Sequence, residues 1–446
     1  MFERPGMRRP ADVSRWKRAR FFSALPSHLP ALATILACVA FASPAATGEQ
    51  ASSETASRTS AEPVPRAEAQ GDAPERLGLT GNWGGLRQRL HGAGVHVVGG
   101  YIVDLSAIRA DGVALGDAAR GLIQLGAAFD LQRMVGLRGG TFFAGFHSFG
   151  GRSGVEVARD VQGYSNIDAD EFVDVAEVWY EQRMARDRVR LKIGRVDANT
   201  EFAFVGAAGA FINSSAGFSP TILTLPTYPQ AMPGVNLAVR TSRRSDVRVG
   251  VYRSTLDGDP LNRDSTALFA IGESAAVWRG RGAWGPGRAV VGAWHDSAIL
   301  PRLASDDGRG AGIESGTMGW YAVLEQQLRL GSGRNAGPNV LSLFSQIGAA
   351  DAAVSPVVGH VSLGAAYGPL VAERGDALGV MLARVALSEE DSASTLRHEL
   401  VVELFYHAPI TRYLFLRPDL QYISTTSSDS GSRDLLAATL RIGIAF

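Results

Sequence analysis

The sequence contains a single cysteine, Cys38, among 446 residues. One cysteine excludes an internal disulfide and any metal site built from several thiolates. Neither charge is in surplus, with 44 Lys+Arg against 44 Asp+Glu, so there is no basic excess for nucleic acid and no acidic tail. Beyond the N-terminal region no run of 18 apolar residues occurs, and this excludes a helical membrane protein.

The start of the chain has the features of a secretory signal peptide. A basic segment is followed by the apolar stretch LPALATILACVAFA, which ends in the A-x-A pattern of Ala40, Phe41 and Ala42. We predict that residues 1–42 are removed. Initiation at Met7 and lipid attachment at Cys38 are alternatives. Residues 43–76, rich in Ala, Ser, Glu and Pro, read as a flexible linker.

The remaining chain is patterned for β-strands. It contributes most of the 52 glycines, and apolar residues alternate with polar or small ones over segments of about ten residues. We place sixteen strands at 97–106, 120–130, 139–149, 172–183, 188–197, 234–240, 246–253, 266–278, 287–295, 317–330, 339–349, 358–367, 377–388, 396–407, 412–422 and 434–446. The fold class is therefore all-β.

Alternation alone fits either a soluble sandwich or a membrane barrel. The connections favour the barrel, because turns such as 184–187, 241–245 and 408–411 are short. The opposite set, 107–119, 150–171, 198–233, 254–265 and 296–316, is long. This asymmetry is typical of a bacterial outer-membrane barrel. We predict a transmembrane antiparallel barrel over residues 96–446, located in the outer membrane and in contact with its lipid.

The last strand ends at the chain terminus on an aromatic residue, Phe446. In a soluble protein an open terminal strand would invite aggregation, whereas in a closed barrel it is paired and the aromatic ring belongs at the interface. We expect Phe446 to act as the sorting signal read by the barrel-insertion machinery.

The longest connection is unusual in composition. Between Glu201 and Arg240 no charged residue occurs, so an exposed loop would present a large apolar patch. We expect the segment 198–233 to fold into the barrel and to narrow it. Its aromatic and amide side chains, such as Phe211, Asn213 and Tyr228, suit a neutral polyol. The alternative is that the rings only pack the loop against the wall.

Two strand segments beside this loop, VWYEQ and RVRLKIGR, carry charges on one parity. We expect an acidic strip next to a basic strip, which would set a transverse field across the lumen; ordinary lumen polarity is the alternative. Arg195 and Asp197 break the parity, which indicates a bulge or a position at the rim. The candidate pore-lining residues are Glu177, Trp179, Glu181, Arg188, Arg190, Lys192, Arg195, Asp197, Glu201, Phe211, Asn213 and Tyr228.

Several ordered motifs give the chain a family resemblance. They are LTGNWGGLRQRL at 79–90, AEVWYEQ at 176–182, LKIGRVDANTEFAF at 191–204, FINSSAGFSP at 211–220, PTYPQAMPGV at 226–235 and RPDLQYI at 417–423. The sequence thereby resembles the carbohydrate-selective outer-membrane porins of the OprB type over residues 77–446.

The resemblance implies a sixteen-stranded barrel that passes mono- and oligosaccharides passively, with an inward-folded third loop. It singles out Glu181, Arg195 and Asn213, and it implies a short periplasmic helix within 77–95. After Ile423 the chain departs from the family's usual Asn-Pro-Gly-Gly, so the shape of the last extracellular loop stays open.

An enzyme is the second class considered. His147 and Ser148 are adjacent on one strand and point to opposite faces, so they cannot form a nucleophile and base pair. No HExxH-like spacing or phosphate loop occurs; we expect no catalytic residues, metal or cofactor. A plugged structural barrel and a general or weakly anion-selective porin are further alternatives. The sequence does not distinguish a monomer from a homotrimer.

Overall fold

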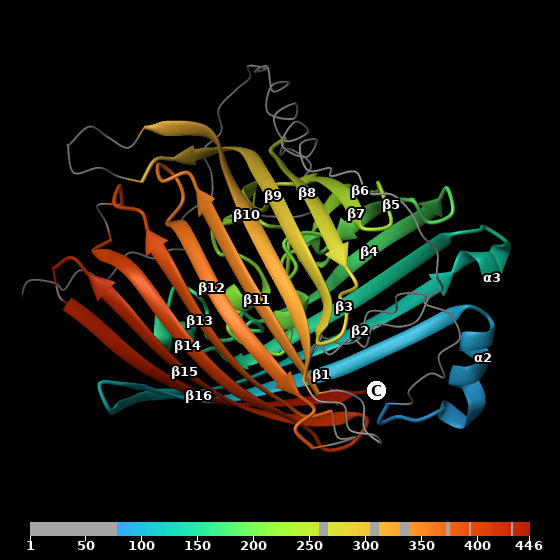
Figure 1. Cartoon of the computed structure of the whole chain (residues 1–446), viewed down its shortest axis with the longest axis horizontal. Coiled ribbons are helices and arrows are strands. Elements are labelled where there is room, and N and C mark those ends of the chain that lie inside the picture. Colours follow the sequence, from blue (N-terminus) through green and yellow to red (C-terminus); the bar gives the residue numbers. More distant parts are fainter. Residues whose placement is uncertain are drawn as a thin grey trace, which may run out of the picture.

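The computed structural model describes residues 78–257, 266–303, 312–330, 339–371, 375–391, 394–429 and 431–446. The predicted signal peptide and linker lie outside these residues. Within them, sixteen antiparallel strands form one closed barrel in which each strand pairs with its sequence neighbours and β1 pairs with β16 (Figure 1). The predicted fold class and strand number are confirmed.

The strands follow one another as up-and-down hairpins around the barrel. Their bounds are β1 Val95–Ala110, β2 Val113–Asp130, β3 Gly140–Arg152, β4 Phe172–Met184, β5 Val189–Val196, β6 Met232–Arg240, β7 Ser245–Arg253, β8 Leu268–Trp278, β9 Trp284–Pro301, β10 Ile313–Leu330, β11 Asn339–Ala350, β12 Val357–Gly368, β13 Ala377–Leu387, β14 Leu396–Pro409, β15 Leu414–Ser427 and β16 Gly431–Ala445.

The helices are short and lie at the strand ends or in loops. The N-terminal pair is η2 (Trp83–Gly85) and α2 (Leu86–Gly92), which confirms the short helix expected before the first strand. The others are α3 (Leu131–Val135), α4 (Val155–Ala158), η3 (Ala198–Thr200), η4 (Gly206–Ala208), α5 (Ser214–Gly217) and η5 (Thr255–Asp257). Among the described residues no helix is long and apolar enough to cross a membrane.

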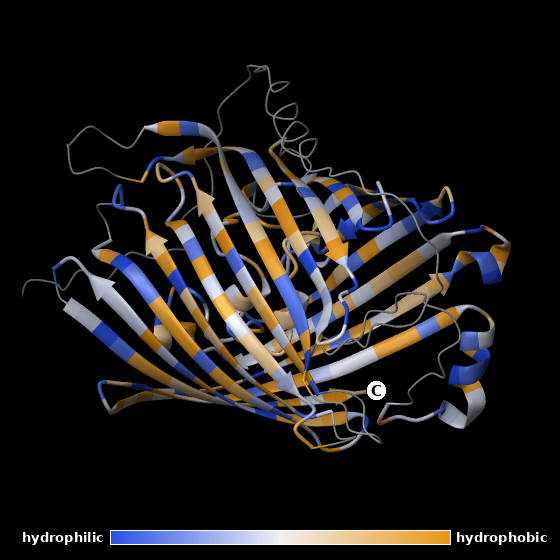
Figure 2. Cartoon of the chain, viewed as in Figure 1, coloured by the Kyte–Doolittle hydropathy of each residue, from blue (hydrophilic) through white to orange (hydrophobic). Residues whose placement is uncertain are grey.

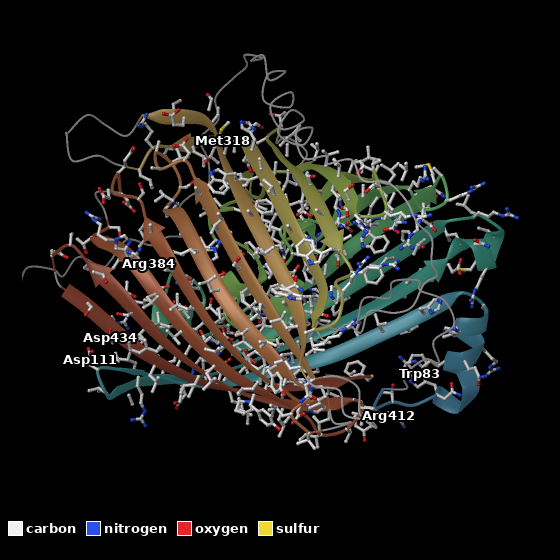
Figure 3. All side chains as sticks on the ribbon, in the orientation of Figure 1. Trp83, Asp111, Met318, Arg384, Arg412 and Asp434 are labelled. Atoms are coloured by element: carbon white, nitrogen blue, oxygen red, sulfur yellow. The ribbon has the colours of Figure 1, made fainter. Side chains whose placement is uncertain are left out.

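The two ends of the barrel differ. Trp83 and Arg412 mark the end that carries α2 and the C-terminus, and Asp111 and Asp434 mark the opposite end (Figure 3). The first is the periplasmic end, because most of its turns are short, whereas the long connections 153–171 and 197–231 start from the other end. Along each strand apolar and polar residues alternate (Figure 2). The exposed parity carries aliphatic side chains such as Leu363, Val380 and Leu404, as a lipid-facing surface requires.

One predicted long loop is wrong. Residues 107–119 form no extended connection, because β1 continues to Ala110 and β2 begins at Val113. The turn is Asp111–Gly112, with φ of 47° and 80°. Positive φ at both central residues defines the tight hairpin turn that the dipeptide Asp-Gly favours. The last extracellular connection, left open by the sequence, is also short, because β15 ends at Ser427 and β16 begins at Gly431.

The first and last strands, β1 and β16, are joined by an ion pair as well as by their backbone hydrogen bonds. Asp104 and Arg441 are direct cross-strand partners, and the Arg441 guanidinium donates to both carboxylate oxygens, at 2.7 and 2.8 Å. Both side chains are buried on the inner face. Such a paired geometry gives a short, charge-assisted bidentate contact.

Candidate functional site

The connection 197–231 lies inside the barrel, where the green loop segments fall between front and rear strands (Figure 1). Its backbone is tied to carboxylates of the wall. Ala203 N–H donates to Glu273 of β8 at 2.9 Å, and Ala207 N–H donates to Glu325 of β10 at 2.7 Å. Further along the loop, the N–H of Ile212 donates to Glu403 of β14 at 2.6 Å. The wall thus supplies the charge that the loop lacks.

The loop's aromatic side chains divide into buried and exposed ones. Phe211 is 1% exposed and packs edge-on against Phe344 and Phe405, with ring centres 5.5 and 4.8 Å away. Phe202 fills the space above Gly250, where an added Cβ would come within 2.7 Å of its ring. Phe204, by contrast, is 37% exposed.

This packing departs from the sequence expectation for two uncharged loop candidates. The candidates Glu177, Trp179, Glu181, Lys192 and Glu201 are buried as well. Phe211 and Asn213 do not line open lumen, because both are buried. Asn213 is 0% exposed, its amide donates to Gln421 at 3.0 Å, and its carbonyl oxygen accepts from Ser215 N–H. The alternative weighed from the sequence, that loop rings pack against the wall, describes Phe211 correctly.

The neighbouring connection 153–171 is tied inward in the same way. The Glu399 carboxylate of β14 accepts from the backbone N–H groups of Val161 and Gln162, both at 2.9 Å. The two loops also bond to each other, since Asn166 N–H donates to Ile212 O at 2.7 Å. They form one inner layer against the wall.

The start of the long loop docks into a cluster of charges on β4 and β5. Glu201 contacts both the Arg190 guanidinium and the Lys192 ammonium. Arg190 also lies 3.1 Å from Glu181, which accepts from Arg183 at 2.8 Å. The sequence predicted an acidic strip next to a basic one, and Glu181 of β4 and Lys192 of β5 are direct cross-strand partners, so the opposite charges of the two strands pair with each other.

Burial alone would raise the pKa of Glu201, but the Lys192 and Arg190 charges and their hydrogen bonds hold it well below the usual range. Glu201 therefore stays ionised at neutral and mildly acidic pH. The ion pairs that hold the loop's first turn are accordingly present throughout this range.

A second charge ladder continues across β7 to β10. Arg248 donates to Glu201 O at 2.9 Å and lies 3.8 Å from Glu273. Arg288 contacts Glu273 at 3.3 Å and Glu325 at 3.1 Å, and it donates to Phe204 O at 3.0 Å. None of Arg248, Glu273, Arg288 or Glu325 was among the sequence candidates. The sequence feature that could have identified them is their position on the inward-facing parity of their strands.

The remaining candidates lie where β5 meets the loop. Glu177 accepts from Trp179 Nε1 and from Asp197 N–H, each at 3.2 Å. Asp197 caps η3 by accepting from Asn199 N–H at 3.0 Å. Arg195 contacts Asp174 and donates to Ala231 O at 2.9 Å.

The choice between a bulge and a rim position is decided for Arg195. Its strand pairing with β4 and β6 continues without a register shift, so it occupies the strand end. Tyr228 donates its hydroxyl to Ile167 O at 2.7 Å and thereby joins the two loops. Arg188 lies exposed in the β4–β5 turn.

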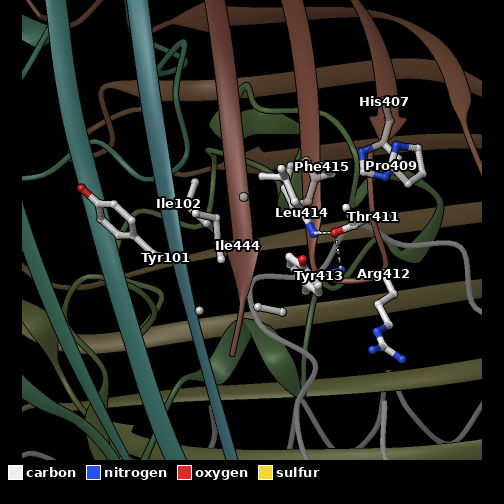
Figure 4. Close-up of a pocket in the computed structure, with 13 residues that line it drawn as sticks. Tyr101, Ile102, His407, Pro409, Thr411, Arg412, Tyr413, Leu414, Phe415 and Ile444 are labelled. Atoms are coloured by element: carbon white, nitrogen blue, oxygen red, sulfur yellow. Dashed lines mark hydrogen bonds between the residues drawn. The ribbon is translucent and has the colours of Figure 1, made fainter. Parts of the chain in front are cut away.

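A separate hollow of about 220 Å³ lies at the periplasmic end of β14, β15, β16 and β1 (Figure 4). Its lining includes Ile102, His407 and Phe415, and the Thr411 hydroxyl accepts from the N–H groups of Tyr413 and Leu414 beside it. This part of the barrel is distant in strand order from the charge ladders on β4 to β10. The hollow is therefore not part of the candidate site.

Comparisons with known proteins agree with this architecture. The model of the carbohydrate-selective porin family OprB matches residues 116–446. Porin B of Pseudomonas aeruginosa is 22% identical over 437 residues, covering 85% of this chain and 93% of Porin B. The high-pH structure of Pseudomonas putida OprB has a TM-score of 0.73 at 20% identity, and the low-pH structure 0.56 at 18%. Each covers 84% of this chain and all of the other.

These structural matches show the same fold, and the family match extends over most of the chain. The chain belongs to the OprB family of carbohydrate-selective porins, channels of the bacterial outer membrane.

Proposed function

We propose that mono- and oligosaccharides diffuse passively through this barrel and that the folded-in loop 197–231 forms its constriction. The observation that carries the proposal is the attachment of the loop's uncharged segment, 202–231, by its backbone, to carboxylates of the wall. Glu273 and Glu325 accept the N–H groups of Ala203 and Ala207, so this segment is held without charges of its own, while Glu201 anchors the loop's first turn by ion pairs.

Within this constriction, we assign sugar contact to Phe204 and the neighbouring arginine Arg288. The exposed Phe204 ring offers an apolar face to sugar C–H groups, and the Arg288 guanidinium next to it offers donors to hydroxyls. Stacking on a ring combined with a few polar contacts orients a polyol without binding it tightly, as diffusion requires.

Liposome swelling tests the proposal directly. The full-length protein, reconstituted in liposomes, should admit neutral sugars faster than amino acids of equal size. Equal rates would remove the selectivity and leave a general pore. Absence of both swelling and conductance would indicate a sealed barrel.

Bilayer conductance gives a second measurement on the same preparation. A panel of neutral sugars should reduce the ion current in a concentration-dependent manner, because an occupied constriction passes fewer ions. The rank order of current block would identify the preferred sugar and its length.

A further inference from the structure

The charges around the constriction are balanced in number but not in exposure. Five cations, Arg183, Arg190, Lys192, Arg248 and Arg288, meet five carboxylates, Glu181, Glu201, Asp246, Glu273 and Glu325. The question is which sign a passing solute meets.

The side chains of four arginines reach the surface. They are 34%, 27%, 25% and 19% exposed for Arg183, Arg190, Arg248 and Arg288. Three carboxylates are sealed behind them, at 5% for Glu181, 4% for Glu201 and 0% for Glu273. Glu325 at 13% and Asp246 at 25% are the more exposed acids of this set, and Asp174, which pairs with Arg195 beside it, is 43% exposed. The exposed surface is therefore mainly guanidinium.

The strand register places three of these arginines in one row. Arg183 pairs with Arg190, Arg190 with Ala238, and Ala238 with Arg248. Adjacent strands lie about 5 Å apart, so the row spans four strands with a guanidinium on three of them. Pairing with buried carboxylates fixes each side chain and leaves part of its donor fork open.

The row continues into a basic periplasmic rim. The turns 185–188 and 241–244 join strands of this row, and 279–283 joins the next pair, β8 and β9. Their arginines are exposed: Arg186, Arg188, Arg243, Arg244, Arg279 and Arg281. Asp187 is the one acidic residue in the three turns. The rim therefore has a net positive charge, which attracts anions to the mouth of the path, and at the row the exposed guanidiniums face the solute.

We infer that the channel also admits sugar acids, such as uronates and aldonates, and prefers them to amino sugars of the same size. The inference rests on the proposed function, because the same constriction carries both. A carboxylate on a hexose is recognised by the partly open guanidinium forks of the row, while its hydroxyls and C–H faces use the contacts proposed for a neutral sugar. A cationic amino sugar meets repulsion along the same path.

Reconstituted full-length protein can be tested with three probes of matched size: glucose, glucuronate and glucosamine. At low ionic strength, glucuronate should enter about tenfold faster than glucosamine, the lower range of electrostatic focusing in charged clefts. The ratio should shrink as salt screens the wall. If glucose enters while glucosamine matches or exceeds glucuronate, the inference is wrong but the sugar pore stands. If glucose itself does not enter, the proposed function fails first.

Substitutions test whether the arginine row causes the preference for glucuronate over glucosamine. The double variant Arg183→Gln with Arg248→Gln should bring the ratio close to one. Arg384→Gln removes one positive charge from the exposed lipid-facing parity of β13 (Figure 3) and should keep the parental ratio. A preference that persists in the double variant would overturn the assignment to the arginine row. Should that variant fail to fold, the salt dependence of the unmodified protein decides alone.

Discussion

The ammonium of Lys192 lies 4.1 Å from the centre of the Trp179 ring, and Phe143 stacks on the same indole at 5.1 Å. Lys192 also contacts Glu201 and lies 3.5 Å from Glu181. One cation thus joins the wall, the aromatic pair and the first turn of the loop. Such a contact gains strength when it is shielded from water.

Because Lys17 falls in the predicted signal peptide, Lys192 is the only lysine expected in the mature chain. Its side chain is 7% exposed, so amine-specific reagents should modify it slowly. In Glu201→Gln the ammonium loses its closest partner, and labelling should become severalfold faster. Peptide mass spectrometry measures the rate at this one residue. The same rate in both proteins would mean that Glu201 does not shield Lys192.

Removing the exposed loop ring should weaken sugar binding without closing the pore. We expect Phe204→Ala to reduce current block by neutral sugars about fivefold, since an aromatic contact contributes about 1 kcal/mol. Phe204→Trp should retain block. Titration of single-channel current with sugar measures both variants, and undiminished block in Phe204→Ala would exclude the ring from the contact.

Removing one hydrogen bond between the barrel wall and the loop should make the loop more mobile. In Glu325→Ala the Ala207 N–H and Arg288 both lose an acceptor. A buried donor left unpaired destabilises the folded loop by about 1–3 kcal/mol. Single-channel conductance and its noise should rise.

Glu314→Ala is the matched control for that change, because it breaks a largely exposed ion pair with Arg302 worth about 0–1 kcal/mol. Its conductance should equal that of the parent. If Glu325→Ala were indistinguishable from this control, the attachment would not position the loop.

The loop 153–171 should respond to pH. Burial and the neighbouring Glu399 carboxylate raise the pKa of Asp160 to about 7. A carboxyl whose pKa is raised in the folded state binds more protons there than in the unfolded state. The folded loop is therefore favoured at low pH and progressively destabilised from the usual pKa of 3.8 up to about 7.

Protease cleavage within 153–171 should accordingly increase between about pH 4 and 7 and change little above that range. Asp160→Asn, which keeps the shape but cannot ionise, should be cleaved at a rate that changes less over this interval. Parallel pH profiles for the two proteins would show that another group is responsible.

The C-terminal residue should matter for assembly. Phe446 N–H donates to Gly99 O at 3.0 Å, and its ring covers Gly99 so closely that an added Cβ would lie 2.7 Å away. Phe446→Ala should lower the amount of barrel in the outer membrane, measured by fractionation. Gly99→Val should perturb the same contact while leaving the terminal residue intact. Unchanged levels in Phe446→Ala would argue against the sorting role.

The strands were predictable because each one faces lipid on one side, and period-two alternation records that directly. The hairpin at Asp111–Gly112 was not predicted, because Asp-Gly occurs in longer loops as well as in the tightest hairpin turn. Loop composition predicted inward folding, but no periodicity indicates which ring of a loop is exposed. The sequence candidate Phe211 is therefore buried, whereas Phe204, which was not among the candidates, is exposed. Glu273 and Glu325 could not be singled out, because several carboxylates share the inward parity and only the structure shows which of them accept hydrogen bonds from the loop.

The Asp104–Arg441 pair has a consequence for how the cylinder shuts. A slip of one residue between the first and last strands would turn every side chain of the slipped strand to the opposite face, so Arg441 would point into hydrocarbon while Asp104 stayed inside without its partner. Both errors are severe in a medium that cannot solvate charge. One ion pair between the first and last strands thus stabilises the correct register and strongly destabilises the register that is shifted by one residue.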